Sequence, residues 1–245
     1  RWDRHTESFL LPEEIETAFA LCKQRNFPVM AHATNPDSVK MAIQLGARSV
    51  EHAYITDEDC IADFVSSGTW YVPTLSISQL SPNLATTEHE KAYAAKKQLS
   101  ADLVVRADAA AEEHRSSFQK ALSAGVNMAL GSDISPMRDS CLLELGLWVK
   151  CGATTFQALQ AATKNAAELC GVGPELGTVE PGKLADLIVV TENPLADIEN
   201  LRQLQLVIKE GQVVADHRRE QRNPLTTITK SSLLNPDCHP RYSRL

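Results

Sequence analysis

Two histidines that close neighbouring strands constrain the fold of this chain more than any other sequence feature. Residues 28–32 (PVMAH) form a short apolar run behind a proline, and residues 49–52 (SVEH) form another about twenty residues later. Between them, apolar residues recur at helical spacing over 37–45. A strand, helix, strand unit of this kind has a right-handed crossover and parallel strands, so we expect His32 and His52 at the same, carboxyl end of adjacent strands.

Side chains at such strand ends point into the mouth of a barrel or the crevice of an open sheet. Two neutral imidazoles there can bind a metal ion, although a lone histidine at a strand end is more often packed or hydrogen-bonded. A third strand-like run, residues 128–134 (MALGSDI), passes through Gly131 and brings Asp133 to the same rim. We therefore predict a metal site formed by His32, His52 and Asp133.

The alternation of helix and strand extends on both sides of this unit. Helices are predicted from Pro12 to about residue 26 and from Asp57 to Gly68, and strands over 69–75 and 126–130. This gives four consecutive strand and helix modules. Four is half of an eightfold barrel, and a four-stranded parallel sheet on its own would leave two bare edges.

The connection between the third and fourth strands is much longer than an ordinary loop. Residues 76–90 are polar, and 88–124 predict one long helix or two consecutive ones. The polar part is either a lid or substrate wall over the rim, or a surface insertion. Tyr71 and Thr74 border the rim and are candidate substrate contacts, with core packing an equal alternative for Tyr71. His89 joins them if the lid closes, whereas His114 is expected at the surface.

Three segments follow from these patterns. Residues 1–175 form the partial barrel, with helices predicted over 141–150, 154–162 and 165–170. Residues 176–215 are β-rich, with a Pro-Gly turn before an alternating strand and two short strands around Glu210-Gly211. Residues 216–245 are a polar tail.

Composition excludes several classes of function. The chain of 245 residues has 43% hydrophobic residues and a net charge of −7, so we expect a globular protein without a nucleic-acid groove. No apolar run approaches the roughly 20 residues of a membrane helix. Six cysteines without a CxxC pair predict reduced thiols and a cytoplasmic location. Because the sequence starts at Arg1 and not at a methionine, secretion stays open.

The order of these motifs resembles a known family. VMAHA, SVEHA, YVPTL, ALGSD, ATKNAAELCGV, GTVEPGKLADLIVV, NPLADI and VIKEGQVV follow one another over about residues 12–215 in the order found in the amidohydrolase superfamily. The similarity is greatest to its imidazolonepropionase-related, Xaa-Pro dipeptidase-like branch. The ordered series is far more specific than any single motif.

The resemblance implies a fold and a set of site residues. The family fold is a (β/α)8 TIM-type barrel with a small β-sandwich, and this chain matches its C-terminal half, strands five to eight, with part of the sandwich. His32 and His52 would be the metal histidines of strands five and six. Asp133 would be the catalytic aspartate of strand eight, which binds metal and handles the proton of the attacking water. The complete enzyme would hold one or two divalent ions, most typically Zn²⁺.

The sequence also departs from the family pattern. Members carry an HxH pair on strand one and, in many, a carboxylated lysine on strand four; this chain has no HxH, and its only lysine before His32 is Lys23. The implied reaction is metal-dependent hydrolysis of an amide-type C–N bond in a dipeptide, an N-acyl amino acid or a cyclic amide. The alternative is a truncated or pseudo-enzyme scaffold without catalysis. We expect weak metal binding by this chain alone, a small-molecule substrate, and either a homo-oligomer or a complementing N-terminal half.

Overall fold

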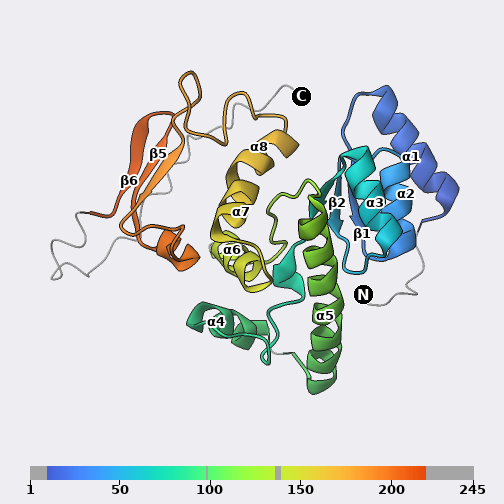
Figure 1. The fold of residues 1–245 in the computed structure, drawn as a ribbon, viewed down its shortest axis with the longest axis horizontal. Coiled ribbons are helices and arrows are strands. Elements are labelled where there is room, and N and C mark those ends of the chain that lie inside the picture. The colour runs from blue at the N-terminus through green and yellow to red at the C-terminus, as the bar shows by residue number, and fades with distance from the viewer. Residues whose placement is uncertain (1–9, 98, 136–138, 219–245) are drawn as a thin grey trace, which may run out of the picture.

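Two small sheets and the helices around them make up an α/β fold (Figure 1). The computed structural model describes residues 10–97, 99–135 and 139–218. The first sheet is parallel and contains, in order, β1 (Met30–Ala33), β2 (Ser49–His52) and β3 (Trp70–Val72). Its register places Ala33 opposite His52. The predicted parallel pairing of the two histidine-bearing strands is therefore confirmed.

A helix precedes each of these strands: α1 (Pro12–Gln24), α2 (Pro36–Gln44) and α3 (Glu58–Ser67). The side chains of Asn35 and Asp57 accept hydrogen bonds from backbone N–H groups of the first turns of α2 and α3, which fixes where these helices begin. Gly68 ends α3 in the left-handed conformation that glycine adopts without steric cost. The buried residues of α2 are those of the predicted apolar face, Val39, Ala42 and Ile43.

The fourth predicted strand is much shorter than expected. Met128 forms one isolated parallel bridge with Tyr71 and no longer strand. The amide of Leu130 donates instead to the carbonyl of Ala161 on a helical segment. Since a backbone N–H bonded to a helix cannot extend a sheet ladder, this segment lies beside β3 for only a single bridge.

The long connection folds as a short 3₁₀ turn, η1 (Leu75–Ile77), followed by two helices, α4 (Glu88–Lys97) and α5 (Ala101–Ala124). The structure thus selects two helices over one. α5 packs on α3 and on the β2 side of the molecule, where the Ser117 hydroxyl accepts a hydrogen bond from the amide of Thr56. The C-terminal half of α5 thus belongs to the core that includes residues of β2 and β3.

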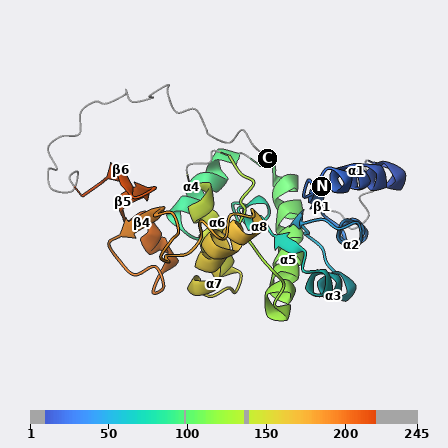
Figure 2. The ribbon, with the colours of Figure 1, turned by 90° about the horizontal axis from the view of Figure 1, so that it is seen from above.

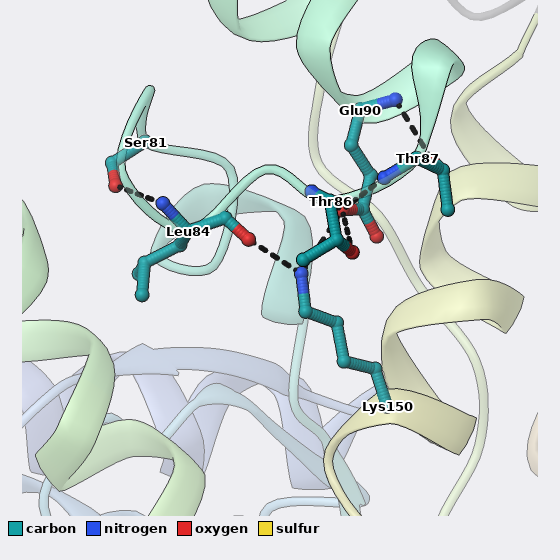
Figure 3. A network of polar contacts seen from close by, with 6 residues as sticks. All are labelled: Ser81, Leu84, Thr86, Thr87, Glu90 and Lys150. Atoms are coloured by element: carbon teal, nitrogen blue, oxygen red, sulfur yellow. Dashed lines mark hydrogen bonds and ion pairs between the residues drawn. The ribbon is translucent and has the colours of Figure 1, made fainter.

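An ion pair between the exposed Lys150 and the buried Glu90 connects the polar part of this connection to the rest of the protein. Lys150 Nζ lies 2.9 Å from Glu90 Oε2 and donates to the carbonyl of Leu84 at 2.6 Å, contacts drawn as dashed lines in Figure 3. The same carboxylate accepts hydrogen bonds from the amide and hydroxyl of Thr86. Because Glu90 is buried and well partnered, residues 84–90 are held against α6 (Ser140–Lys150).

A second helical layer lies between the two sheets, as Figures 1 and 2 both show. It consists of α6, α7 (Thr155–Gln160) and α8 (Ala166–Leu169), with α7 and α8 joined by the π-helical segment η2 (Ala161–Asn165). Trp148 of α6 meets Phe118 of α5 edge to face with ring centroids 5.0 Å apart. This aromatic pair joins the second layer to the helix that covers the first sheet.

The second sheet is antiparallel and contains β4 (Leu187–Val190), β5 (Leu204–Lys209) and β6 (Gln212–Asp216), with η3 (Ile198–Arg202) before β5. These are the strands predicted for the β-rich segment. Several of its apolar side chains are exposed: Ile188, Val189, Val213 and Val214. The predicted polar tail begins within the end of β6, and residues 219–245 lie outside the described ranges. No helix of the described chain is both long and apolar enough to cross a bilayer.

Candidate metal centre

The two predicted metal histidines lie side by side at the carboxyl ends of β1 and β2. Their ring centroids are 4.6 Å apart, with the ring planes at 69°. His32 is exposed, whereas His52 has only 6% of its surface accessible. Parallel pairing of two short strands that end at the same level is what brings residues twenty positions apart into contact.

Asp133 reaches the same rim. Its Oδ2 lies 4.0 Å from Nε2 of His52, and 64% of the carboxylate side chain is exposed. His52 is thus the shared neighbour of an exposed imidazole and an exposed carboxylate. All three predicted ligands lie at one end of the parallel strands.

A buried threonine hydrogen-bonds to Nδ1 of His52, the ring nitrogen that is not near Asp133. Thr74, only 3% exposed, places its Oγ1 2.6 Å from His52 Nδ1, which leaves Nε2 on the side of Asp133. Burial, followed by the charge of His32, lowers the pKa of His52 from 6.5 to about 4. The ring is therefore neutral near pH 7, the form in which imidazole binds a metal.

Strained backbone is concentrated at this rim. His52, Thr74 and Asp133 have φ values of 74°, 51° and 49°, in the left-handed region that residues other than glycine avoid. For threonine, which is branched at Cβ, this conformation is a true outlier. Such strain persists only where surrounding contacts impose it, and it is most common at functional sites.

Glu51, the residue before His52 on β2, also lies near these side chains. In the structure Glu51 accepts a hydrogen bond from Ser49 Oγ and lies opposite His32 in the register, while Val50 packs into the core with α2 and α3. Burial, and after it the charge of Asp133, raises the pKa of Glu51. Glu51 is thus a partly buried carboxyl close to the candidate metal residues.

The donor set fits a divalent ion, but its members are not gathered around one point. Within the described ranges, no three His, Cys, Asp or Glu side chains form a ready metal-binding group. His52 instead contacts its two candidate co-ligands pairwise. Two imidazoles and a carboxylate match the ligand preferences of Zn²⁺, and an exposed Asp133 can move to close the set.

The three predicted substrate contacts lie in different surroundings. Thr74 is at the rim but is engaged by His52. Tyr71 is fully buried and stacks at a tilt on Phe64 of α3, so its side chain is in the core on the helix side of the sheet. His89 is exposed on α4. Whether any of them contacts substrate stays a prediction.

Two buried ionisable residues near the rim were missed by the sequence analysis. His114, expected at the surface, is fully buried on α5, where Nδ1 is 2.8 Å from the Ser78 hydroxyl and the ring meets Tyr54 edge to face. Its place in the stripe 107, 111, 114, 118, 121, at helical spacing, could have indicated this. Glu144 is fully buried on α6, and its position between Leu143 and Leu145 gave only a weak signal.

The segment that carries Asp133 depends on the absence of a side chain at Gly131. A Cβ added there would lie 2.6 Å from Val72 Cγ1 on β3. We expect Gly131→Ala to lower the free energy of unfolding by about 1–3 kcal/mol, as overpacking does, when measured by urea denaturation. Val72→Ala removes the colliding methyl, so adding Gly131→Ala to that variant should cost little. An equal cost in both backgrounds would contradict this explanation.

Known proteins resemble this chain over most of its length. The amidohydrolase family model matches residues 9–214. Ochratoxinase of Aspergillus niger is 32% identical over 192 residues, covering 77% of this chain and 37% of the relative. Imidazolonepropionase of Brucella suis is 30% identical over 187 residues, covering 73% and 39%.

Solved structures give the same result. A Xaa-Pro dipeptidase with bound methionine superposes with a TM-score of 0.70 at 29% identity, covering 83% of this chain and 48% of that one. A. niger ochratoxinase superposes with the same score at 30% identity, covering 84% and 46%. The chain thus spans less than half the length of these relatives. With paired histidines and an aspartate at the ends of parallel strands and a family match over most of its length, the chain belongs to the amidohydrolase family.

Proposed function

We propose that this chain is the C-terminal half of a metal-dependent hydrolase of amide-type C–N bonds. The observation that carries the proposal is the position of His52, in contact with the His32 ring and 4.0 Å from the Asp133 carboxylate in a chain of this family. The names of its relatives, a dipeptidase, an ochratoxinase and an imidazolonepropionase, favour a dipeptide, an N-acyl amino acid or a cyclic amide as substrate.

His32, His52 and Asp133 would hold a divalent ion, for which Zn²⁺ suits the donor set best, as one of one or two ions in the complete enzyme. Such an ion lowers the pKa of bound water and polarises the substrate carbonyl. In this chain, Thr74 fixes the ring of His52, and the exposed carboxylate of Asp133 can accept a proton from water and return it to the leaving amine.

Three observations support the view that other residues complete the site. No residue of α1 is buried, and Leu11, Phe27 and Met30 around it and β1 are exposed, Met30 by 72%. Among the described strands, β1 pairs only with β2. The sequence has neither the HxH pair nor a matching strand-four lysine. We infer that a complementing N-terminal half, or less simply a second copy of the chain, covers this edge.

Location is part of the same proposal. Five described cysteines are free thiols, two of them buried. Reduced thiols without a disulfide framework favour the cytoplasm.

The decisive experiment is a hydrolase screen with added Zn²⁺. It compares this chain with the protein extended by its upstream coding region, using dipeptides, N-acyl amino acids and cyclic amides. We expect turnover only in the extended protein. Turnover by this chain alone would overturn the claim that the site is incomplete. Inactivity of both would favour the scaffold without catalysis.

A further inference from the structure

Glu144 is a buried acid to which the proposed reaction assigns no task. It lies on α6, between two leucines, and its side chain has no solvent-accessible surface. Burial raises its pKa from 4.5 to about 7 despite four hydrogen bonds that favour the charged form. An acid kept in the core at such a cost needs a structural or functional reason.

The partners of Glu144 converge on one short turn. Oε1 accepts from the amide of Leu75 at 2.8 Å, and Oε2 accepts from the amide of Ser76 at 2.8 Å and from its hydroxyl at 2.5 Å. The indole of Trp148 donates the fourth hydrogen bond, to Oε1 at 3.1 Å. One carboxylate thus fixes two consecutive amides of η1 from a helix almost seventy residues later in the chain.

The residue immediately before this turn is Thr74, whose φ and ψ are both 51°. A β-branched residue in the left-handed region is unfavourable by itself, so the amides that follow it must be held in place. In that conformation the Thr74 hydroxyl meets His52 Nδ1 at 2.6 Å. Glu144 is therefore linked to His52 in three steps. Glu144 accepts hydrogen bonds from η1, the peptide bond joins Leu75 of η1 to Thr74, and the Thr74 hydroxyl contacts His52.

We propose that Glu144 is a positioning residue, which holds Thr74 so that its hydroxyl keeps the proton of His52 on Nδ1 and leaves the Nε2 lone pair facing Asp133. This inference rests on the proposed function for its purpose, because a metal-binding histidine needs one free nitrogen and is oriented by the group that binds the other. The tautomer itself is a property of the metal-free chain. It can be measured whether or not the chain hydrolyses anything.

The test is the tautomer of His52, read from long-range ¹H–¹⁵N NMR of metal-free protein with ¹⁵N-labelled histidine at pH 7.5. This pH lies above the ordinary pKa of histidine, so the tautomers of a neutral ring are compared. A His52→Gln sample assigns the signal. We expect the Nδ1–H form to dominate in the unmodified chain, and its ratio to the Nε2–H form to fall roughly fivefold in Thr74→Val, the effect of one lost hydrogen bond.

Glu144→Gln keeps the shape of the side chain but replaces one acceptor oxygen by a donor. We expect the same direction of change as in Thr74→Val and no further change in the double variant, since Glu144 acts through Thr74. Trp148→Phe is the matched control: it removes a donor to Glu144 on the same helix without touching the turn, and should leave the tautomer unchanged.

Two results would overturn the proposal. One is an Nε2–H form that dominates in the unmodified chain or is unaffected by Thr74→Val. The other is a Glu144→Gln protein in which the tautomer of His52 is the same as in the unmodified chain. This result would show that Glu144 only stabilises the core. If Glu144→Gln does not fold, Ser76→Ala, which removes only the hydroxyl bond to Oε2, supplies the same comparison. A negative hydrolase screen changes none of these readings, so the two proposals fail independently.

Discussion

Replacing Asp133 by asparagine in the complete enzyme is expected to lower kcat by about 10²- to 10⁴-fold, the usual contribution of a general acid and base. Asparagine has nearly the same shape, but its amide cannot accept a proton from water and return it to the leaving amine. Since the Asp133 side chain is 64% exposed, the substitution should leave the unfolding transition almost unchanged. Steady-state kinetics and circular dichroism of the same preparations measure both effects.

Ser132→Ala is the matched control for this variant. Ser132 neighbours Asp133 in the same rim segment and has no role in the proposed chemistry, so kcat should stay within a factor of a few of the unmodified value. An Asp133→Asn enzyme with more than about a tenth of the original kcat would remove Asp133 from the proton-transfer role. Equal losses in both variants would show that the segment's conformation, and not the carboxylate, had been tested.

The second large effect is expected in acid, and it comes from His114. Burial, and then the charge of His52, lowers the pKa of His114 from 6.5 to about 3. Below pH 6.5, His114 therefore binds a proton in the unfolded chain but not in the folded chain. The folded state loses stability as the pH falls below this value. Between pH 6.5 and 4 this single histidine should lower the free energy of unfolding by roughly 3 kcal/mol.

Two other buried groups act in the same range. The lowered pKa of His52, about 4, adds a loss of the same sign. The raised pKa of Glu144, about 7, has the opposite sign: its folded form is protonated where the unfolded form is not, so stability rises as the pH falls from 7 to 4.5. The contributions of His52 and Glu144 largely cancel between pH 4.5 and 6.5. His114 therefore makes the main contribution to the change in unfolding free energy over this range.

The variant His114→Phe isolates the contribution of His114 to the pH dependence of stability. Phenylalanine fills a similar volume against Tyr54 but cannot titrate, and the hydrogen bond to Ser78 is lost at every pH. The difference in unfolding free energy between the two proteins, from urea titrations at several pH values, should therefore change by roughly 3 kcal/mol between pH 6.5 and 4. His89→Gln, at an exposed position on α4, is the control for the removal of a histidine at the surface. A constant difference for His114→Phe would contradict a neutral buried ring.

Local sequence signals predicted much of the parallel layer because they act over a few residues. A capping side chain, an apolar spacing of three and four, and a glycine after the last turn fix α2 and α3 within their own segments. The twenty-residue repeat then brings His32 and His52 together, since parallel strands joined by one helix can end only at the same edge.

The predictions that failed concern contacts between distant segments. The run 126–130 has the composition of a strand, but the amide of Leu130 bonds to Ala161 on the helical layer, thirty-one positions away. His114 was assigned to the surface as the default for a histidine in this long helical segment, although α5 turns that side chain toward Tyr54.

The sequence by itself determined the three strands of the parallel sheet with the helices before them, their order, and the three side chains that reach one rim. Only the tertiary structure decided how those side chains are held. Glu144 accepts hydrogen bonds from the turn after β3, Thr74 contacts His52, and Gly131 lies close against Val72. The physical reason is the distance along the chain over which each kind of interaction acts. Helix caps and strand periods act between residues close in the chain, whereas strained backbone is kept in place by buried hydrogen bonds and packing from elements far along it.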